Sequence, residues 1–227
     1  MGEKTVDPVR AGRNHAQGVD GPRPVLKPVL TALVGGNDEL IERVAKIYLK
    51  AGDKVADVTF GRGVFWKKID LKYIVLNTSD LVTVENGKYD FRALPYKDNE
   101  FDVVVLDPPY MHGSGSVKPS LNKCYQNNSA ATTSMSHEKI IDMYVEGALE
   151  ARRILKKGGL LWVKCQDEIE SGRQRWSHVE ILALVEAIGF KAIDLFVLVS
   201  TAGPLMRRKY QLHARKNHSY LWIFKKL

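Results

Sequence analysis

Residues 103–110 read VVVLDPPY, so four strand-forming residues run directly into an acid, two prolines and a tyrosine. Proline has no N–H for a sheet ladder and fixes its own φ. Pro108 and Pro109 therefore end the strand and hold the next backbone groups rigid. The stretch predicts a stiff platform at a strand end that carries one carboxylate, Asp107, and one aromatic ring, Tyr110.

A glycine turn lies upstream, in ADVTFGRG at residues 56–63. Gly61 and Gly63 permit a tight turn and a close approach of a ligand to the backbone, and the helix expected behind them offers unpaired N–H groups. The third glycine of the dinucleotide fingerprint is missing, since position 66 is Trp66, which argues against an NAD site. Asp57 supplies a carboxylate for a cationic or hydroxylated ligand, or else satisfies local backbone N–H groups.

Strand and helix patterns alternate along the chain. This alternation predicts an α/β fold with a mainly parallel sheet covered on both faces. The helix at 38–51 is expected to place Leu40, Ile41, Val44, Ile47 and Tyr48 on one face. The other expected helices are 64–69, 137–155 and 178–190, and the expected strands are 54–59, 72–77, 101–107, 158–165, 192–200 and 218–226.

Length and composition predict one domain. The chain has 227 residues, 44% of them hydrophobic, with a domain expected at 29–227 after a polar basic arm at 1–28. Cys124 and Cys165 have no ligand-spaced partners, so neither a disulfide framework nor a metal site is expected. No apolar run suggests a membrane span or signal peptide, and a soluble cytoplasmic protein is expected.

Residues 111–136 form a polar, aperiodic stretch directly after the platform. A structureless segment of this length inside a compact domain is usually functional or disordered, so an active-site loop is expected here.

Three polar clusters follow predicted strands, at 57–63, 107–110 and 164–168. Ligands in open parallel sheets bind beyond the carboxyl ends of the strands, so these clusters are expected to share one edge. Lys164, Gln166 and Asp167 either reach a bound substrate or form a salt-linked strand end.

ADVTFGRG, followed by YDFRALPYKDNEFDVVVLDPPY at residues 89–110, resembles the class I S-adenosylmethionine-dependent methyltransferases that act on exocyclic amino groups of nucleic-acid bases. The resemblance covers Lys54 to Cys165, with a looser fit to the last strand. It implies a single Rossmann-like domain with an antiparallel C-terminal strand, and S-adenosyl-L-methionine as cofactor.

The resemblance also implies cofactor contacts. Gly61 and Gly63 would lie against the methionine part of the cofactor. An acid at the end of the second strand usually holds the ribose, and here Asn77 stands at that place with Asp80 three residues later; Asp80 is preferred. The full set implied for the cofactor is Asp57, Thr59, Phe60, Gly61, Gly63, Asp80 and Asp90, the last at the adenine amine.

The chemistry of the implied reaction explains the platform. An exocyclic amine is a poor nucleophile because its lone pair is delocalised into the ring. If the Asp107 carboxylate and the Pro108 carbonyl accept its two hydrogens, the lone pair points at the methyl donor, which is catalysis by positioning. Pro109 keeps that carbonyl rigid, and Tyr110 stacks on a base that has been flipped out of the duplex.

A net charge of +8 indicates a polyanionic partner. The segment at 206–217 interleaves basic and aromatic residues and is expected to contact nucleic acid, the alternative being a solvated basic loop. The residues expected to bind nucleic acid are Lys164, Arg207, Arg208, Lys209, Arg215 and Lys216, with Tyr210 and His213 among them.

The substrate implied by the resemblance is adenine N6 in DNA, because Asp at the first position of Asp-Pro-Pro-Tyr is commoner in such enzymes. RNA guanine-N2 and DNA cytosine-N4 methylation remain alternatives, as does a catalytically inactive nucleic-acid-binding subunit. The chain has little room for a target-recognition domain. Relaxed or short sequence specificity is therefore expected, or a partner subunit or homodimer that reads the sequence.

Overall fold

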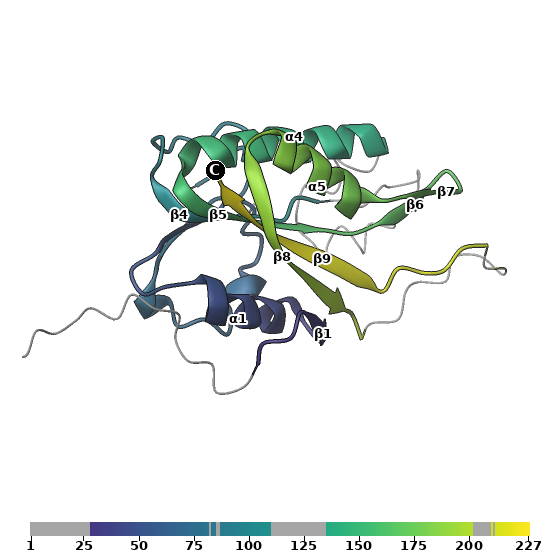
Figure 1. Cartoon of the computed structure of the whole chain (residues 1–227), viewed down its shortest axis with the longest axis horizontal. Coiled ribbons are helices and arrows are strands. Elements are labelled where there is room, and N and C mark those ends of the chain that lie inside the picture. The colour runs from purple at the N-terminus through teal and green to yellow at the C-terminus, as the bar shows by residue number, and fades with distance from the viewer. Residues whose placement is uncertain (1–27, 82, 85–86, 110–134, 202–209, 211) are drawn as a thin grey trace, which may run out of the picture.

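The computed structural model describes residues 28–81, 83–84, 87–109, 135–201, 210 and 212–227. Within them, seven strands form one sheet in the order β1-β8-β9-β5-β4-β2-β3 (Figure 1). The strands are Ala32–Val34 (β1), Lys54–Asp57 (β2), Val75–Thr78 (β3), Phe101–Leu106 (β4), Leu155–Cys165 (β5), Phe190–Val199 (β8) and His218–Lys226 (β9).

Strand β9 alone among these seven runs against its neighbours. It pairs in antiparallel fashion with both β5 and β8, whereas the β1–β8, β2–β3, β2–β4 and β4–β5 pairs are parallel. A mainly parallel sheet with an antiparallel C-terminal strand is thus confirmed.

Helices cover both faces of the sheet. Figure 1 shows α4 and α5 on one side of the sheet and α1 on the other. The helices in the described part are Asn37–Tyr48 (α1), His137–Ile154 (α4) and Ser177–Ala187 (α5), with 3₁₀ turns at Val64–Trp66 (η1) and Leu71–Tyr73 (η2).

The apolar run at residues 103–106 of the central strand β4 is explained by burial on both faces of the sheet. Val104 and Leu106 belong to the core that contains the buried face of α4, while Val103 and Val105 belong to the core beneath α1. All four side chains are almost completely buried. A strand between two layers of helices has no solvent face, so the polar alternation of a half-exposed strand is lost.

The register of the parallel pairs brings the three polar clusters together. Asp57 pairs with Val105, and Leu106 pairs with Val163, so Asp107 and Lys164 follow at the same level. The expected common edge is therefore confirmed, since these residues all lie at the carboxyl ends of adjacent strands.

Two expectations about helices were wrong in detail. Residues 64–69 form only a short 3₁₀ turn, with Trp66 N–H bonded to Gly63 O and Lys67 N–H to Val64 O. The tighter winding buries Phe65 and Trp66 together at the end of the glycine turn. In α1, Ile47 is 45% exposed instead of lying on the buried face, because at 3.6 residues per turn it falls just outside the arc of Leu40, Ile41 and Val44.

The sequence pattern missed four short elements. One is the 3₁₀ turn η2, which occupies the start of the strand expected at 72–77, so that β3 begins only at Val75. Strand β1 lies at the edge of the sheet, and Glu168–Glu170 (β6) pairs with Arg173–Arg175 (β7) in a separate hairpin. The expected arm at 1–28 and loop at 111–136 fall outside the described residues except at their last residues, 28 and 135–136. Among the described residues, no helix combines the length and apolarity that a membrane crossing needs.

Candidate active site

The Asp57 carboxylate stabilises the glycine turn through two hydrogen bonds. Its Oδ1 accepts a hydrogen bond from Thr59 N (3.1 Å), and its Oδ2 accepts one from the Trp66 indole Nε1 (2.7 Å). Burial raises the pKa of Asp57 to about 7, against the opposing effect of the two donors and with the help of Asp107 and Asp80 nearby. The structure therefore supports the local role for this carboxylate, and a direct contact with the cofactor stays a prediction.

Gly61 and Gly63 both adopt the left-handed conformation, with φ of 54° and 66°. A Cβ on Gly63 would lie 2.6 Å from Phe60 Cζ, whereas a Cβ on Gly61 would meet only Thr59 O, at 3.9 Å. The backbone of Gly61 therefore borders open space, which suits a ligand lying against the turn. Phe60 N donates to Ser79 O (3.1 Å) and ties the turn to the end of β3.

Asp80 is the acid that the fold brings to this turn. Its Oδ2 accepts from Gly61 N (3.2 Å) and its Oδ1 from Thr83 N (2.9 Å). Asn77, by contrast, directs its amide at Val75 O within its own strand, at 3.5 Å. The geometry favours Asp80 over Asn77, as expected, and the ribose contact itself stays a prediction.

Asp90 lies in a segment beside the end of β3. The carbonyl of Gly87, three residues earlier, accepts from Asp80 N (3.0 Å). Arg92 holds the Asp90 carboxylate with its Nε (2.9 Å to Oδ1) and Nη2 (2.6 Å to Oδ2), which lowers the pKa of Asp90. Asp90 is therefore an ionised carboxylate held in a local ion pair, and its contact with the adenine amine stays a prediction.

Asp107 is joined to the glycine turn by one hydrogen bond. Its N–H donates to Thr59 Oγ1 at 2.7 Å, which links the ends of β2 and β4. Its Oδ1 is buried and accepts no hydrogen bond from any described residue, with Lys164 Nζ at 3.8 Å. Burial raises the pKa of Asp107, opposed by the charge of Lys164. A buried acceptor without a donor lowers the stability of the fold unless a bound group supplies the hydrogen bond.

The platform continues only in part within the described residues. Pro108 is buried and Pro109 half-buried. Tyr110, expected to stack on the target base, lies outside them. Its role stays a prediction.

The cluster after β5 is held within the fold. Lys164 is only 4% exposed and faces Asp107, Gln166 donates to His218 O (2.9 Å), and Asp167 Oδ1 accepts from His178 N (3.2 Å). The structure thus supports the salt-linked strand end. A contact of Lys164 with nucleic acid stays a prediction that its burial does not favour.

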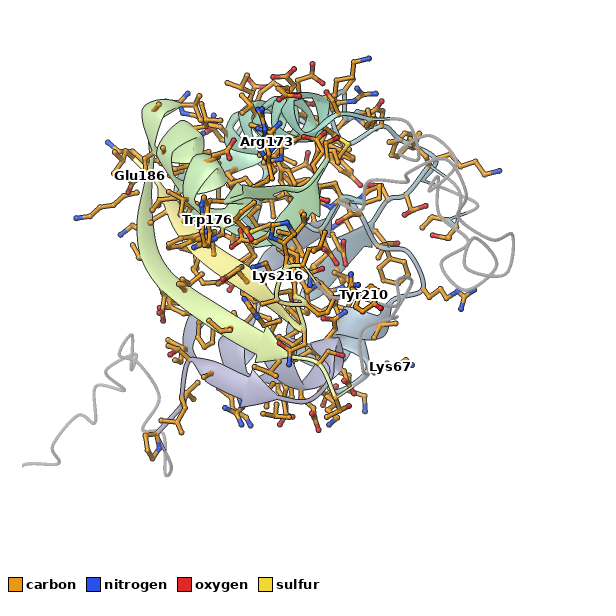
Figure 2. The ribbon with its side chains drawn as sticks, turned by 90° about the vertical axis from the view of Figure 1, so that its right-hand side faces the viewer. Lys67, Arg173, Trp176, Glu186, Tyr210 and Lys216 are labelled. Carbon is orange, nitrogen blue, oxygen red and sulfur yellow. The ribbon has the colours of Figure 1, made fainter. Side chains whose placement is uncertain are left out.

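The basic segment is described only at its end. Arg207, Arg208 and Lys209 lie outside the described residues, while Arg215 is exposed. Lys216 Nζ lies 5.7 Å from the centre of the Trp176 ring (Figure 2). Their contact with nucleic acid stays a prediction. Trp176 was missed by sequence reasoning, although a tryptophan after the basic Arg-Gln-Arg stretch 173–175 was a usable signal.

The arrangement fits the methyl donor and amine substrate that the resemblance implies. Gly61 offers open space at the turn, Asp80 is bonded to it, and Asp107 presents a buried acceptor one strand away. No group of three or more His, Cys, Asp or Glu side chains suited to a metal ion occurs in the part of the chain that the structure describes.

Comparison with solved structures found similar folds. A protein of Bacillus halodurans C-125, assigned provisionally as a methyltransferase, is 15% identical over 84% of this chain and 99% of its own, with a TM-score of 0.53. A SAM-dependent methyltransferase of Methanosarcina mazei is 13% identical over 79% of this chain and 95% of its own, with a TM-score of 0.46.

A DNA modification methylase of Thermus thermophilus, also assigned provisionally and solved with S-adenosyl-L-methionine, is 17% identical with a TM-score of 0.38. The match covers 58% of this chain and 48% of that one, so this chain spans about half the length of that protein. A search of curated proteins gave no match.

The sheet order and the match to a DNA methylase family model together define a class I methyltransferase, a class that uses S-adenosyl-L-methionine as methyl donor. More narrowly, the chain belongs to the N6/N4 DNA methylase family. The model of that family matches residues 101–227, which is more than half of the chain and includes both β4 and the antiparallel strand β9.

Proposed function

We propose that this protein methylates an exocyclic amino group of a base in DNA, with adenine N6 as the target. The observation that carries the proposal is the buried Asp107 Oδ1 at the end of β4, which accepts no hydrogen bond from any described residue. A target amine supplies the donor that this oxygen lacks.

The chain's own residues then do three things. Thr59 and Pro108 hold the platform in place, because the Asp107 N–H is bonded to Thr59 Oγ1 and Pro108 fixes the backbone. The Asp107 carboxylate accepts a hydrogen bond from the amine and orients its lone pair. The raised pKa of Asp107 suits it to take the proton that the amine nitrogen loses once the new N–C bond has formed.

S-adenosyl-L-methionine, when bound, carries the methyl group on a positively charged sulfur. Once the methyl group is transferred, the rest of the cofactor leaves as a neutral thioether. Gly61 and Gly63 would lie against its methionine part, with Thr59 and Phe60 in the same turn. Asp80 would face the ribose from the end of β3, at the distance of one hydrogen bond from Gly61.

The DNA substrate is supported by family membership and by the net charge of +8. Adenine is supported by the Asp at the first position of Asp-Pro-Pro-Tyr. We also propose that sequence reading is short, relaxed or supplied by a second subunit.

The test supplies tritiated S-adenosyl-L-methionine with DNA and RNA in separate reactions, followed by digestion to nucleosides. We expect label in DNA as N6-methyldeoxyadenosine. Label in deoxycytidine would overturn the choice of base, and label confined to RNA guanine would overturn the DNA substrate. No transfer together with no cofactor binding by calorimetry would indicate a non-catalytic subunit.

The Asp107→Asn variant tests the mechanism with little change in shape. We expect loss of transfer by about 100-fold or more with cofactor affinity retained, since the group acts on the amine. Asp142→Asn, at an exposed carboxylate on α4, is the matched control and should leave both quantities unchanged. An Asp107→Asn protein with wild-type turnover would remove the mechanism.

A further inference from the structure

One of the four tryptophans differs from the other three in its solvent exposure. Trp66, Trp162 and Trp222 are at most 9% exposed, whereas Trp176 is 54% exposed. Trp176 lies between β7 and the first residue of α5. An exposed indole contributes little to the core, and tryptophan is enriched at binding interfaces because its ring is apolar and its N–H polar.

The start of α5 is fixed to the edge of the sheet that carries Asp107. Asp167 follows the end of β5, and its Oδ1 accepts from His178 N at 3.2 Å and lies 2.7 Å from His178 Nδ1. Trp222 Nε1 on β9 donates to His178 O (3.0 Å). Strands β4 and β9 are two strand spacings apart, about 10 Å. Trp176, directly before α5, therefore lies at the same edge of the sheet as Asp107.

The Trp176 indole contacts one of two stacked aromatic rings. The His178 ring stacks on the Tyr220 ring, with centroids 4.1 Å apart and planes 14° apart, and Trp176 meets His178 edge-on at 6.4 Å. Tyr220 Oη lies 3.1 Å from His218 Nε2. The ring system is anchored on β9, so little conformational freedom remains to be lost when a ligand binds.

Positive charge borders the same indole. Lys216 Nζ lies 5.7 Å from the centre of the Trp176 ring, and Figure 2 labels Lys216, Trp176 and Arg173 on the face turned to the viewer. Arg173 and Arg215 are exposed. Arg175, in contrast, forms an ion pair with Glu170, with Nη2 2.7 Å from Oε2. An exposed aromatic face bordered by basic side chains is the arrangement that binds single-stranded nucleic acid.

We propose that Trp176 is a stacking platform for an unstacked base next to the target nucleotide, and that Lys216 contacts the adjacent phosphate. Extruding a base from a duplex breaks the stacking of its neighbours, and an indole can replace one of those stacks. The inference rests on the proposed function, since it needs DNA at the edge of the sheet where Asp107 lies.

The first experiment measures acrylamide quenching of intrinsic tryptophan fluorescence in the full chain. Because the other three indoles are buried, quenching reports on Trp176. Single-stranded and duplex oligonucleotides should each lower the quenching constant, and Trp176→Phe should abolish that change. A quenching constant that DNA leaves unchanged in the wild type, while DNA is bound, overturns the platform.

The second experiment compares KM for DNA in methyl transfer. Trp176→Ala should raise KM about 5- to 150-fold, which is the 1–3 kcal/mol of one stacked base at 1.4 kcal/mol per tenfold. Trp176→Phe should keep most of the affinity, and kcat at saturating DNA should stay near the wild-type value. Tyr73→Ala is the matched control, since Tyr73 is 63% exposed but lies just before β3, at the opposite edge of the sheet.

The third measurement is the salt dependence of binding. Lys216→Met should lower the slope of log K against log salt by about one unit if Lys216 contacts one phosphate. An unchanged slope overturns the role of Lys216. If Trp176 becomes protected on raising the protein concentration without DNA, the surface joins copies of the chain and the proposal falls.

The outcomes separate this inference from the proposed function. A wild-type protein that methylates DNA, together with Trp176→Ala at unchanged KM, refutes the platform alone. A wild-type protein that neither binds nor methylates DNA refutes the proposed function and the platform with it.

Discussion

Replacing Thr59 by Val should weaken both the fold and the reaction. Thr59 Oγ1 accepts the hydrogen bond from Asp107 N at 2.7 Å, and this bond joins the glycine turn to the proposed catalytic residue. Valine has nearly the same shape but no acceptor. The variant therefore leaves a backbone N–H without a partner in a partly buried position.

The magnitude follows from the loss of that acceptor. An unsatisfied buried donor costs about 1–3 kcal/mol. For a chain of 227 residues, each kcal/mol lowers Tm by about 2–4 °C, so Tm should fall by about 2–12 °C. Turnover should also fall, because the Asp107 carboxylate is no longer held against the turn and small displacements of a catalytic group are costly.

Two assays check this, thermal unfolding by calorimetry and tritium transfer at saturating cofactor. Thr59→Ser keeps the hydroxyl and is the matched control, with a smaller change in Tm and most of the turnover. If Thr59→Val and Thr59→Ser had equal Tm and equal turnover, the bond would not couple the two strand ends and the reasoning would be refuted.

Three further changes test the site. Gly63→Ala should lower the free energy of unfolding, measured in urea, more than Gly52→Ala does. Both glycines have positive φ, so alanine at either position brings a strain of about 1–2 kcal/mol. Only at Gly63 would the added Cβ also meet the Phe60 ring, at 2.6 Å. Asp57→Asn should remove a pH dependence of stability. Because burial raises the pKa of Asp57 to about 7 from 3.8, the folded state keeps a proton that the unfolded chain releases, and the wild type should lose up to about 4 kcal/mol relative to the variant as pH rises from 4 to 7. Methyl transfer should decline as pH is lowered, with an acid limb of kcat/KM above the pKa of an ordinary aspartate, because burial raises the pKa of Asp107 and protonation removes its charge.

Each of these has an outcome that contradicts it. Equal losses in the two glycine variants would mean that the Phe60 ring moves aside without cost. A stability gap between wild type and Asp57→Asn that is constant from pH 4 to 7 would mean that Asp57 is ionised throughout. Turnover that stays level down to pH 4 would show that the protonation of Asp107 does not limit the reaction.

Most of the regular elements were predictable from sequence. The apolar run at residues 103–106 of β4 and the long periodic helix α4 have clear patterns, which is why both elements were predicted correctly. Strand β1 was missed because three residues show no period. It is a strand only because β8 supplies ladder partners, as in the bonds from Val197 N to Thr31 O and from Gly35 N to Val199 O.

The positions of the candidate site residues were predictable at strand ends and less so between them. The choice of Asp80 over Asn77 as the acid at the glycine turn depends on which side chain reaches Gly61 N. A local sequence pattern cannot predict a distance between residues that are far apart in the chain. Trp176 was overlooked because a lone tryptophan in a sequence is most often part of a core, and only its exposure in the fold distinguishes it.

The sequence by itself determined the positions of the glycine turn and the Asp-Pro-Pro end, because glycine and proline restrict the backbone locally, wherever the rest of the chain lies. Only the tertiary structure decided that Asp107 faces Lys164, that Thr59 bridges two strands and that burial raises the pKa of Asp57. Those properties depend on distances between residues far apart in the chain and on exclusion of water, which exist only once the strands are paired and the helices packed.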